Sequence, residues 1–182
     1  MEKKFAPSHL DVKAFAQGAG ELSGASPLAQ WTRLSLEQVS GGDVASPVHW
    51  RLQGRTEPTS GSDDEIWLDL DAEVDLPMQC QRCLKPVLST VLAERSFRFV
   101  ADEATAAALD DEAEEDILVL NREFDALALV EDELIMALPL VPRHETCPEA
   151  VVMTVSDPEV ADVQERPHPF AALASLKKPS SS

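Results

Sequence analysis

The stretch "IWLDLDAEVDLP", residues 66–77, decides the fold because its side chains alternate between two kinds. One parity carries the apolar residues Ile66, Leu68, Leu70, Ala72, Val74 and Leu76, and the other carries Trp67, Asp69, Asp71, Glu73 and Asp75. Successive side chains of a strand point to opposite faces, so this pattern predicts a strand with one buried and one solvated face. Such strands are typical of antiparallel sheets. We expect Pro77 to end the strand, because proline cannot donate to a ladder.

Further strands are expected before and after this one. Apolar and β-branched residues favour strands at residues 31–39 ("WTRLSLEQV"), 48–55 ("VHWRLQGR") and 87–100 ("VLSTVLAERSFRFV"). The short apolar run "ILVL", residues 117–120, is typical of a buried strand. Residues 75–87, "DLPMQCQRCLKPV", therefore lie at a hairpin tip or between two consecutive strands.

One segment, "FDALALVEDELIMALPLVP", changes the period of its apolar residues. They recur there at spacings of three and four, at Leu127, Val130, Leu134 and Leu138. That period predicts a helix over residues 126–138, capped by Asp125 and ended with the help of Pro139. The helix carries three consecutive acids that cannot all lie on its buried stripe, namely Glu131, Asp132 and Glu133.

These elements predict an α+β fold with a mostly antiparallel sheet, with a partly closed barrel as an alternative, one principal helix and flexible termini. We expect an N-terminal arm (residues 1–30), an α+β core domain (31–150), and a Pro-rich linker with a C-terminal apolar tail motif (151–182). Residues 101–116 carry eight acids and many alanines, so we expect a solvated loop or a frayed helix there.

The C-terminal apolar tail motif is the more organised part of the last segment. Phe170, Leu173 and Leu176 recur at spacings of three, which places them on one face of a short helix. Such a helix is too short to be stable alone in water, so it docks on its own domain or serves as a recognition peptide. These three residues, with Arg82 and Lys85 beside the cysteine pair, are our candidate partner-binding residues.

The charge balance limits the partners. Fifteen Lys and Arg residues face 33 Asp and Glu residues, which gives a formal net charge of -18. Nucleic-acid binders use basic patches to neutralise phosphates, so the chain as a whole would be repelled by RNA, DNA or an anionic membrane. Basic proteins are the partners that this charge favours, although it also serves solubility. No apolar stretch suits a signal peptide or a membrane span, so we expect a cytoplasmic protein.

Three cysteines do not make a disulfide scaffold, but two of them, Cys80 and Cys83, form a C-x-x-C pair. With His144 and Cys147 they would supply the four ligands of a closed structural zinc site. A redox dithiol is a second interpretation, although reactive pairs usually begin a helix and a β-rich run follows here. Two small residues at a turn are the third, and these three interpretations stay open.

No enzyme constellation stands out in the sequence. It contains no phosphate-binding loop, no Gly-rich dinucleotide loop and no G-x-S-x-G motif. Cys147 and His144 could be written as a nucleophile and base, but only the adjacent Glu145 is near to orient them. We therefore expect a protein without catalytic residues.

Three segments together resemble the YceD family of large ribosomal RNA subunit accumulation proteins. They are "CQRCLKP" (80–86), "LVEDELIMALPLVPRHETC" (129–147) and "PFAALASLK" (169–177), and the resemblance extends over residues 60–178. It implies a role in the synthesis, processing or stability of large-subunit (23S) ribosomal RNA, and it carries over no catalytic residue. Some relatives have more cysteines where this chain has only Cys147, so a complete metal site here depends on His144.

Charge and resemblance together predict a non-enzymatic factor in large ribosomal subunit biogenesis that contacts basic ribosomal proteins. Its expected partners are large ribosomal subunit precursors, with ribosomal RNA itself reached through a local basic patch as the alternative contact, and neither DNA nor a membrane. The rival from another class is a Cys- or metal-dependent hydrolase or nuclease acting on RNA.

Overall fold

The computed structural model describes residues 5–41, 45–59, 61, 63–109 and 113–149. The chain divides into two compact units, Met1–Pro148 and Glu149–Ser182, and of the second only Glu149 is described. The apolar tail motif at Phe170, Leu173 and Leu176 therefore lies outside the described residues.

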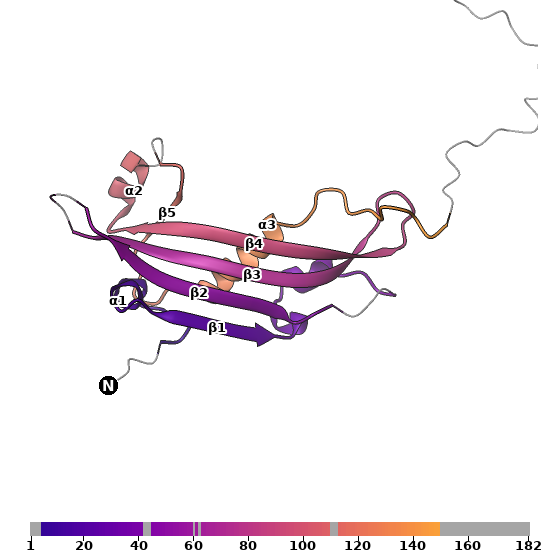
Figure 1. Cartoon of the computed structure of the whole chain (residues 1–182), viewed down its shortest axis with the longest axis horizontal. Helices are drawn as coiled ribbons and strands as arrows, with labels where there is room; N and C mark the ends of the chain where they lie inside the picture. Colours follow the sequence, from indigo (N-terminus) through magenta and orange to yellow (C-terminus); the bar gives the residue numbers. More distant parts are fainter. Residues whose placement is uncertain (1–4, 42–44, 60, 62, 110–112, 150–182) are drawn as a thin grey trace, which may run out of the picture. The chain divides into compact units, whose positions relative to one another are not determined.

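A single five-stranded sheet organises the first unit (Figure 1). The elements in chain order are α1 (Val12–Gln17), β1 (Glu21–Ser26), the 3-10 helices η1 (Leu28–Gln30) and η2 (Leu34–Glu37), β2 (Val48–Glu57), β3 (Glu65–Gln79), β4 (Pro86–Val100), α2 (Glu103–Leu109), β5 (Asp116–Val119) and α3 (Ala126–Met136). The strands lie in the order β1-β2-β3-β4-β5, antiparallel except for the parallel pair β4–β5.

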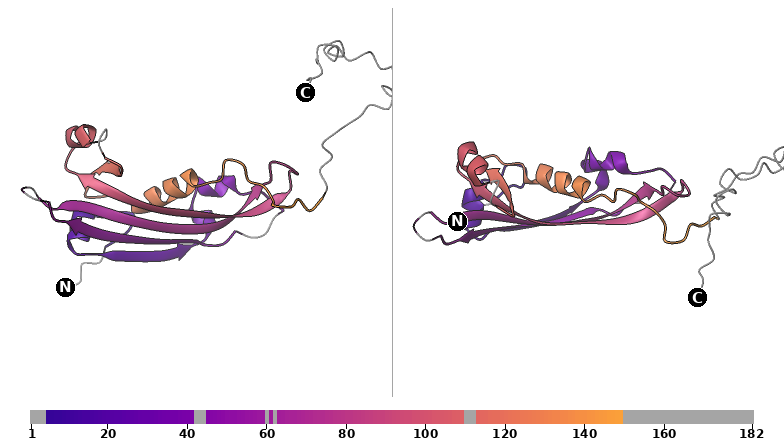
Figure 2. Two further views of the ribbon diagram at one scale, coloured as in Figure 1. Left: turned by 45° about the horizontal axis from the view of Figure 1, so that its top comes forward. Right: turned by 90° about the horizontal axis from the view of Figure 1, so that it is seen from above.

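The predicted α+β class with a mostly antiparallel sheet is confirmed. The sheet is open, because β1 and β5 form its two edges and do not pair with each other among the described residues, so the barrel alternative is wrong. Seen edge-on in Figure 2, α1, α3 and the 3-10 helices lie on one face of the sheet. Residues 5–30, within the segment expected to be an arm, contribute α1, β1 and η1 to this unit.

The alternation in β3 builds the core as expected. Its even-numbered side chains face the helices, and Leu68, Val74 and Leu76 are fully buried there. The partners across β4 continue this face, since Leu68 lies opposite Phe97 and Val74 opposite Val91. The odd-numbered side chains of β3 form the other face, which holds all five acids of the strand.

Pro77 does not end β3, which continues to Gln79. The backbone N–H and carbonyl of Asp75 point away from β4. The carbonyl accepts from Ser46 N at 3.0 Å, and the N–H donates to Ser46 Oγ at 2.7 Å. Pro77 has the same orientation, and its carbonyl accepts from Val39 N at 2.9 Å. The missing proline N–H thus points to the side of β2, whose pairing with β3 stops at His49 and Glu73, so no ladder bond is lost.

The strand expected at residues 31–39 is also wrong. The segment forms η2, preceded by η1, and the buried side chains Leu28, Trp31 and Leu34 recur every three residues. That spacing matches the three residues per turn of a 3-10 helix and places all three side chains on one side.

The remaining predictions differ mainly in bounds. β2 and β4 are confirmed, and β5 is a strand, but as an edge strand its residues Ile117, Leu118 and Val119 are only half-buried. α2 buries no residue, in agreement with the solvated segment expected there. α3 begins after the predicted cap Asp125, whose carboxylate accepts from Ala128 N at 3.0 Å, and ends two residues earlier than expected.

Two acids of α3 are buried, whereas Asp132 between them is exposed. Glu131 Oε1 accepts from the backbone N–H groups of Arg33 at 2.8 Å and Leu34 at 3.1 Å, and its Oε2 pairs with Arg33 Nη2 at 3.1 Å. Glu133 Oε2 lies 3.3 Å from Arg95 Nε. Glu131 therefore ties the turn before η2 to the principal helix.

Candidate metal centre

The C-x-x-C pair lies in the tight turn between β3 and β4, as the sequence predicted. Cys80 N donates to the Lys85 carbonyl at 2.9 Å, and Leu84 N donates to the Cys80 carbonyl at 2.8 Å. Leu84 adopts φ of 60°, a left-handed conformation that is unfavourable for a residue with a side chain. The turn buries Cys80 completely and leaves Cys83 half-buried.

The second pair arrives from the segment that follows α3. Residues 137–149 run from the end of α3 to the turn between β3 and β4 (Figure 1). Gln81 N donates to the Pro142 carbonyl at 2.8 Å, which fixes this segment just before His144. His144 and Cys147 are thereby placed beside Cys80 and Cys83, about 60 residues away in sequence.

Four potential ligand atoms converge at this point. One atom each from Cys80, Cys83, His144 and Cys147 lies within 4.8 Å of all the others. In a tetrahedral site with zinc–sulfur bonds of about 2.3 Å, sulfur atoms lie about 3.8 Å apart, so shifts of less than about 1 Å would close the site. The cluster could therefore bind a metal ion such as zinc.

The imidazole of His144 is oriented for such a role. Its Nε2 lies 2.9 Å from the Pro86 carbonyl, which can only accept, so Nε2 carries the proton. Its Nδ1 lies 3.4 Å from Cys83 Sγ and, in the neutral imidazole, offers the lone pair that a metal ion would take. A carbonyl that fixes the tautomer in this way is a usual feature of metal-binding histidines.

The thiols differ in their electrostatics. Burial raises the pKa of the Cys80 thiol, but backbone N–H groups of Cys83, His144 and Arg82 outweigh it and lower the pKa to about 5. Burial also raises the pKa of the Cys83 thiol; Lys85 N–H opposes that rise, and the neighbouring Cys147 and Cys80 add to it. Sulfurs held this close favour a shared cation over several bare thiolates.

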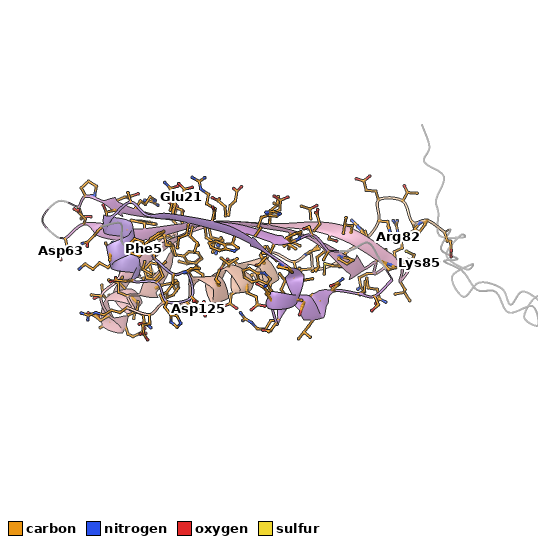
Figure 3. All side chains as sticks on the ribbon, turned by 90° about the horizontal axis from the view of Figure 1, so that it is seen from below. Phe5, Glu21, Asp63, Arg82, Lys85 and Asp125 are labelled. Atoms are coloured by element: carbon orange, nitrogen blue, oxygen red, sulfur yellow. The ribbon has the colours of Figure 1, made fainter. Side chains whose placement is uncertain are left out.

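Arg82 has a structural contact that the sequence did not reveal. Its Nε donates to Cys147 Sγ at 3.1 Å, and its Nη2 donates to the carbonyls of His144 at 2.5 Å and Glu145 at 3.2 Å. The guanidinium thus holds the second ligand pair against the turn. Figure 3 shows Arg82 and Lys85 at this same end of the sheet, and their predicted partner-binding role stays a prediction.

Neither rival interpretation accounts for the whole cluster. A redox dithiol needs only Cys80 and Cys83, so it would not account for His144 and Cys147 beside them. A simple turn would not require His144 and Cys147 to converge on the same point. For the contact of Arg82 with Cys147, the one signal in the sequence was the position of Arg82 between Cys80 and Cys83.

The fold and the cluster define a class: an open-sheet α+β protein with a candidate Cys3His metal centre at the tip of its longest hairpin. Within that class, the family model for the large ribosomal RNA subunit accumulation protein YceD matches residues 68–177, and the chain belongs to this family. The match contains all four members of the cluster, and it confirms the resemblance seen in the sequence.

A relative in Haemophilus influenzae, named large ribosomal RNA subunit accumulation protein YceD, is 36% identical over 108 residues. The matched part covers 58% of this chain and 62% of that relative, so the chain spans less than two thirds of the relative's length. No solved structure matches the chain significantly. Within the described ranges, no helix has the length and apolar character needed to span a bilayer.

Proposed function

We propose that this protein is a non-enzymatic cytoplasmic factor that supports the accumulation of large-subunit (23S) ribosomal RNA, with a structural zinc ion at Cys80, Cys83, His144 and Cys147. The observation that carries this proposal is the convergence of four potential ligands inside the region that matches the family. The role in ribosomal RNA accumulation is what the family's description and the printed name of the Haemophilus relative support.

The ligand set favours a structural ion over a catalytic one. Structural zinc sites are closed by four protein ligands, whereas catalytic sites use three and leave one position for water or substrate. Here three sulfurs and one imidazole nitrogen would fill all four positions. A hydrolase or nuclease using this metal would need an open position, so the donor set supports a role without catalysis.

The partner that charge favours is a basic ribosomal protein on a large-subunit precursor. With a formal net charge of -18, the chain would be repelled by bare ribosomal RNA, because it offers too few cations to displace the counterions of the phosphates. Ribosomal proteins are an abundant basic class, and electrostatic attraction speeds encounter with them.

Metal content tests the zinc ion directly. Full-length protein purified without chelator should contain one zinc per chain, and His144→Ala should lose most of it. The matched control is His9→Ala, because His9 is exposed and its imidazole is not part of the cluster. Equal zinc content in the two variants, or no zinc in the wild type, would refute the metal assignment.

Gene deletion tests the cellular role. Cells lacking the protein should show a lower ratio of large-subunit to small-subunit ribosomal RNA, and the wild-type gene should restore it. The Cys147→Ser variant should restore it only in part, because the ion holds the turn and the following segment together. A normal ratio in the deletion strain would refute the proposed function.

A further inference from the structure

Within the part of the chain that the structure describes, no helix covers the second face of the sheet, which is called the open face below. All the described helices near the sheet lie on the opposite side, as the edge-on view in Figure 2 shows. Side chains of one parity from β1, β2, β3 and β4 point to this open face, and those of β3 include Asp69, Asp71, Glu73 and Asp75. Cross-strand hydrogen bonds confirm this orientation, with Ser96 Oγ donating to Asp69 and Thr90 Oγ1 to Asp75, both at 2.6 Å.

Carboxylates outnumber cations on the open face, and each arginine there is already engaged. Arg51 Nε pairs with Glu21 at 3.0 Å. Arg55 Nε pairs with Asp69 at 2.8 Å, and the same guanidinium contacts Glu57. Arg98 Nη2 pairs with Glu65 at 2.7 Å. Arg51 lies directly opposite Asp71, but its ion pair is with Glu21, so carboxylates without an ion pair remain in the middle of the face.

Three exposed acids at the centre have no ion pair among the described residues, namely Asp71, Glu73 and Glu94. Asp71 lies directly opposite Arg51 of β2 on one side and Glu94 of β4 on the other. The like charges of Asp71 and Glu94 repel one another across the two strands. A bound cation would relieve this repulsion.

The same place is hollow and partly apolar. A shallow hollow of about 440 Å³ is lined on this face by His49, Arg51, Asp71, Glu73, Leu92 and Glu94, among others. Leu92 is 60% exposed and Leu88, farther along β4, is 46% exposed. The hollow therefore offers apolar contact for an aliphatic side-chain stem beside carboxylates for its charged end, which suits lysine and arginine.

We propose that the open face binds an extended, lysine- or arginine-rich segment of a basic protein along β3. This inference rests on the proposed function and names the surface that takes the basic partner. Asp71, Glu73 and Asp75 alternate along β3, so neighbouring carboxylates are about 7 Å apart, the spacing of alternate side chains in an extended peptide. A segment with cations at every second position would meet each acid in turn, whereas a nucleic acid would bring phosphates against them.

A binding titration tests the surface. Full-length protein is titrated into a labelled 15-residue peptide of alternating lysine and threonine, with an RNA oligonucleotide as the second probe. We expect the peptide to bind and the RNA not to bind at the same ionic strength. The triple variant Asp71→Asn, Glu73→Gln, Glu94→Gln should bind the peptide about tenfold more weakly, as expected for three exposed ion pairs.

The matched control removes three charges elsewhere, by Glu37→Gln, Glu103→Gln and Glu123→Gln, all of them exposed and outside the strands of the open face. If both triple variants bind the peptide equally weakly, the effect comes from net charge alone and the inference is wrong. Preferential binding of RNA over the peptide would also refute it. In deletion cells, normal ribosomal RNA restored by the open-face variant would refute this surface alone. A deletion without effect on ribosomal RNA would instead refute the proposed function.

Discussion

Replacing Glu131 by alanine or by glutamine separates two contributions of one buried carboxylate. Glu131 is 7% exposed, and its Oε1 accepts from the backbone N–H groups of Arg33 and Leu34. Its Oε2 contacts the guanidinium of Arg33, whose side chain is 50% exposed. Glutamine keeps a carbonyl oxygen that can accept from both N–H groups, whereas alanine removes every contact.

The expected magnitudes follow from burial. Hydrogen bonds to a charged group contribute about 1.5–3 kcal/mol each, and Leu34 is fully buried, so its N–H would lose its partner in the alanine variant. We expect Glu131→Ala to lower the free energy of unfolding by about 3 kcal/mol. Glu131→Gln should cost about 1 kcal/mol, because the ion pair it removes is half in solvent.

Urea unfolding followed by circular dichroism measures both changes at pH 7. The control is Asp132→Ala, which removes an exposed partner of the same arginine and should cost no more than about 0.5 kcal/mol. If glutamine costs as much as alanine, the ion pair dominates and the reasoning from the backbone N–H groups is wrong.

The difference in stability between wild type and Glu131→Gln should also depend on pH. Burial raises the pKa of Glu131, but the N–H groups of Leu34 and Arg33 and the Arg33 guanidinium outweigh it, so the net shift is downward. A lowered pKa in the folded state stabilises the fold above the unfolded value of about 4.3. That contribution disappears as pH falls through the folded pKa. The difference in the free energy of unfolding between wild type and Glu131→Gln should therefore become smaller in acid. A gap that widens in acid would contradict the sign of the shift.

Three other substitutions have definite expectations. Glu133→Gln should stabilise the protein at pH 7, measured by urea unfolding, because burial raises the pKa of Glu133 and its ionised form therefore opposes folding above the unfolded pKa. Gly54→Ala should cost about 2–3 kcal/mol in the same assay, because a Cβ there would lie 2.8 Å from Ala16 Cα in the backbone of α1. Arg82→Met should weaken zinc binding about tenfold in competition with a chromophoric chelator, because Arg82 Nε contacts Cys147 Sγ; unchanged affinity would show that this contact is incidental.

The sequence predicted those elements whose signal is local. The strict alternation around Leu70 and the cap at Asp125 both act within a few residues, so β3 and α3 could be identified without tertiary information. The predictions were wrong where contacts with segments distant in the sequence determine the local structure. Pro77 is tolerated in β3 because β2 ends earlier, and the segment at Trp31 is helical because its three-residue spacing packs on the core.

Burial of the α3 acids could not be predicted for the same reason. Glu131 pairs with Arg33, 98 residues away, and Glu133 lies beside Arg95 of β4. From the sequence alone such acids are expected to be solvated, because burial of a carboxylate without a partner is unfavourable. The sequence does not show which distant cation would be the partner.

The candidate cluster could be assembled by counting ligands, since Cys80, Cys83, His144 and Cys147 were the natural set of four. The sequence could not show which imidazole nitrogen faces the sulfurs. That depends on Nε2 meeting the Pro86 carbonyl, a contact between residues 58 positions apart.

The cluster lies at the outer end of the hairpin, beyond the last β2–β3 pair at His49 and Glu73. The apolar interior between sheet and α3 is built without it, so protein that lacks the ion should keep its sheet and core. Two preparations could then give the same far-UV circular dichroism spectrum while differing entirely in zinc occupancy. Elemental analysis of each batch, rather than a spectrum, is what makes measurements on this protein comparable.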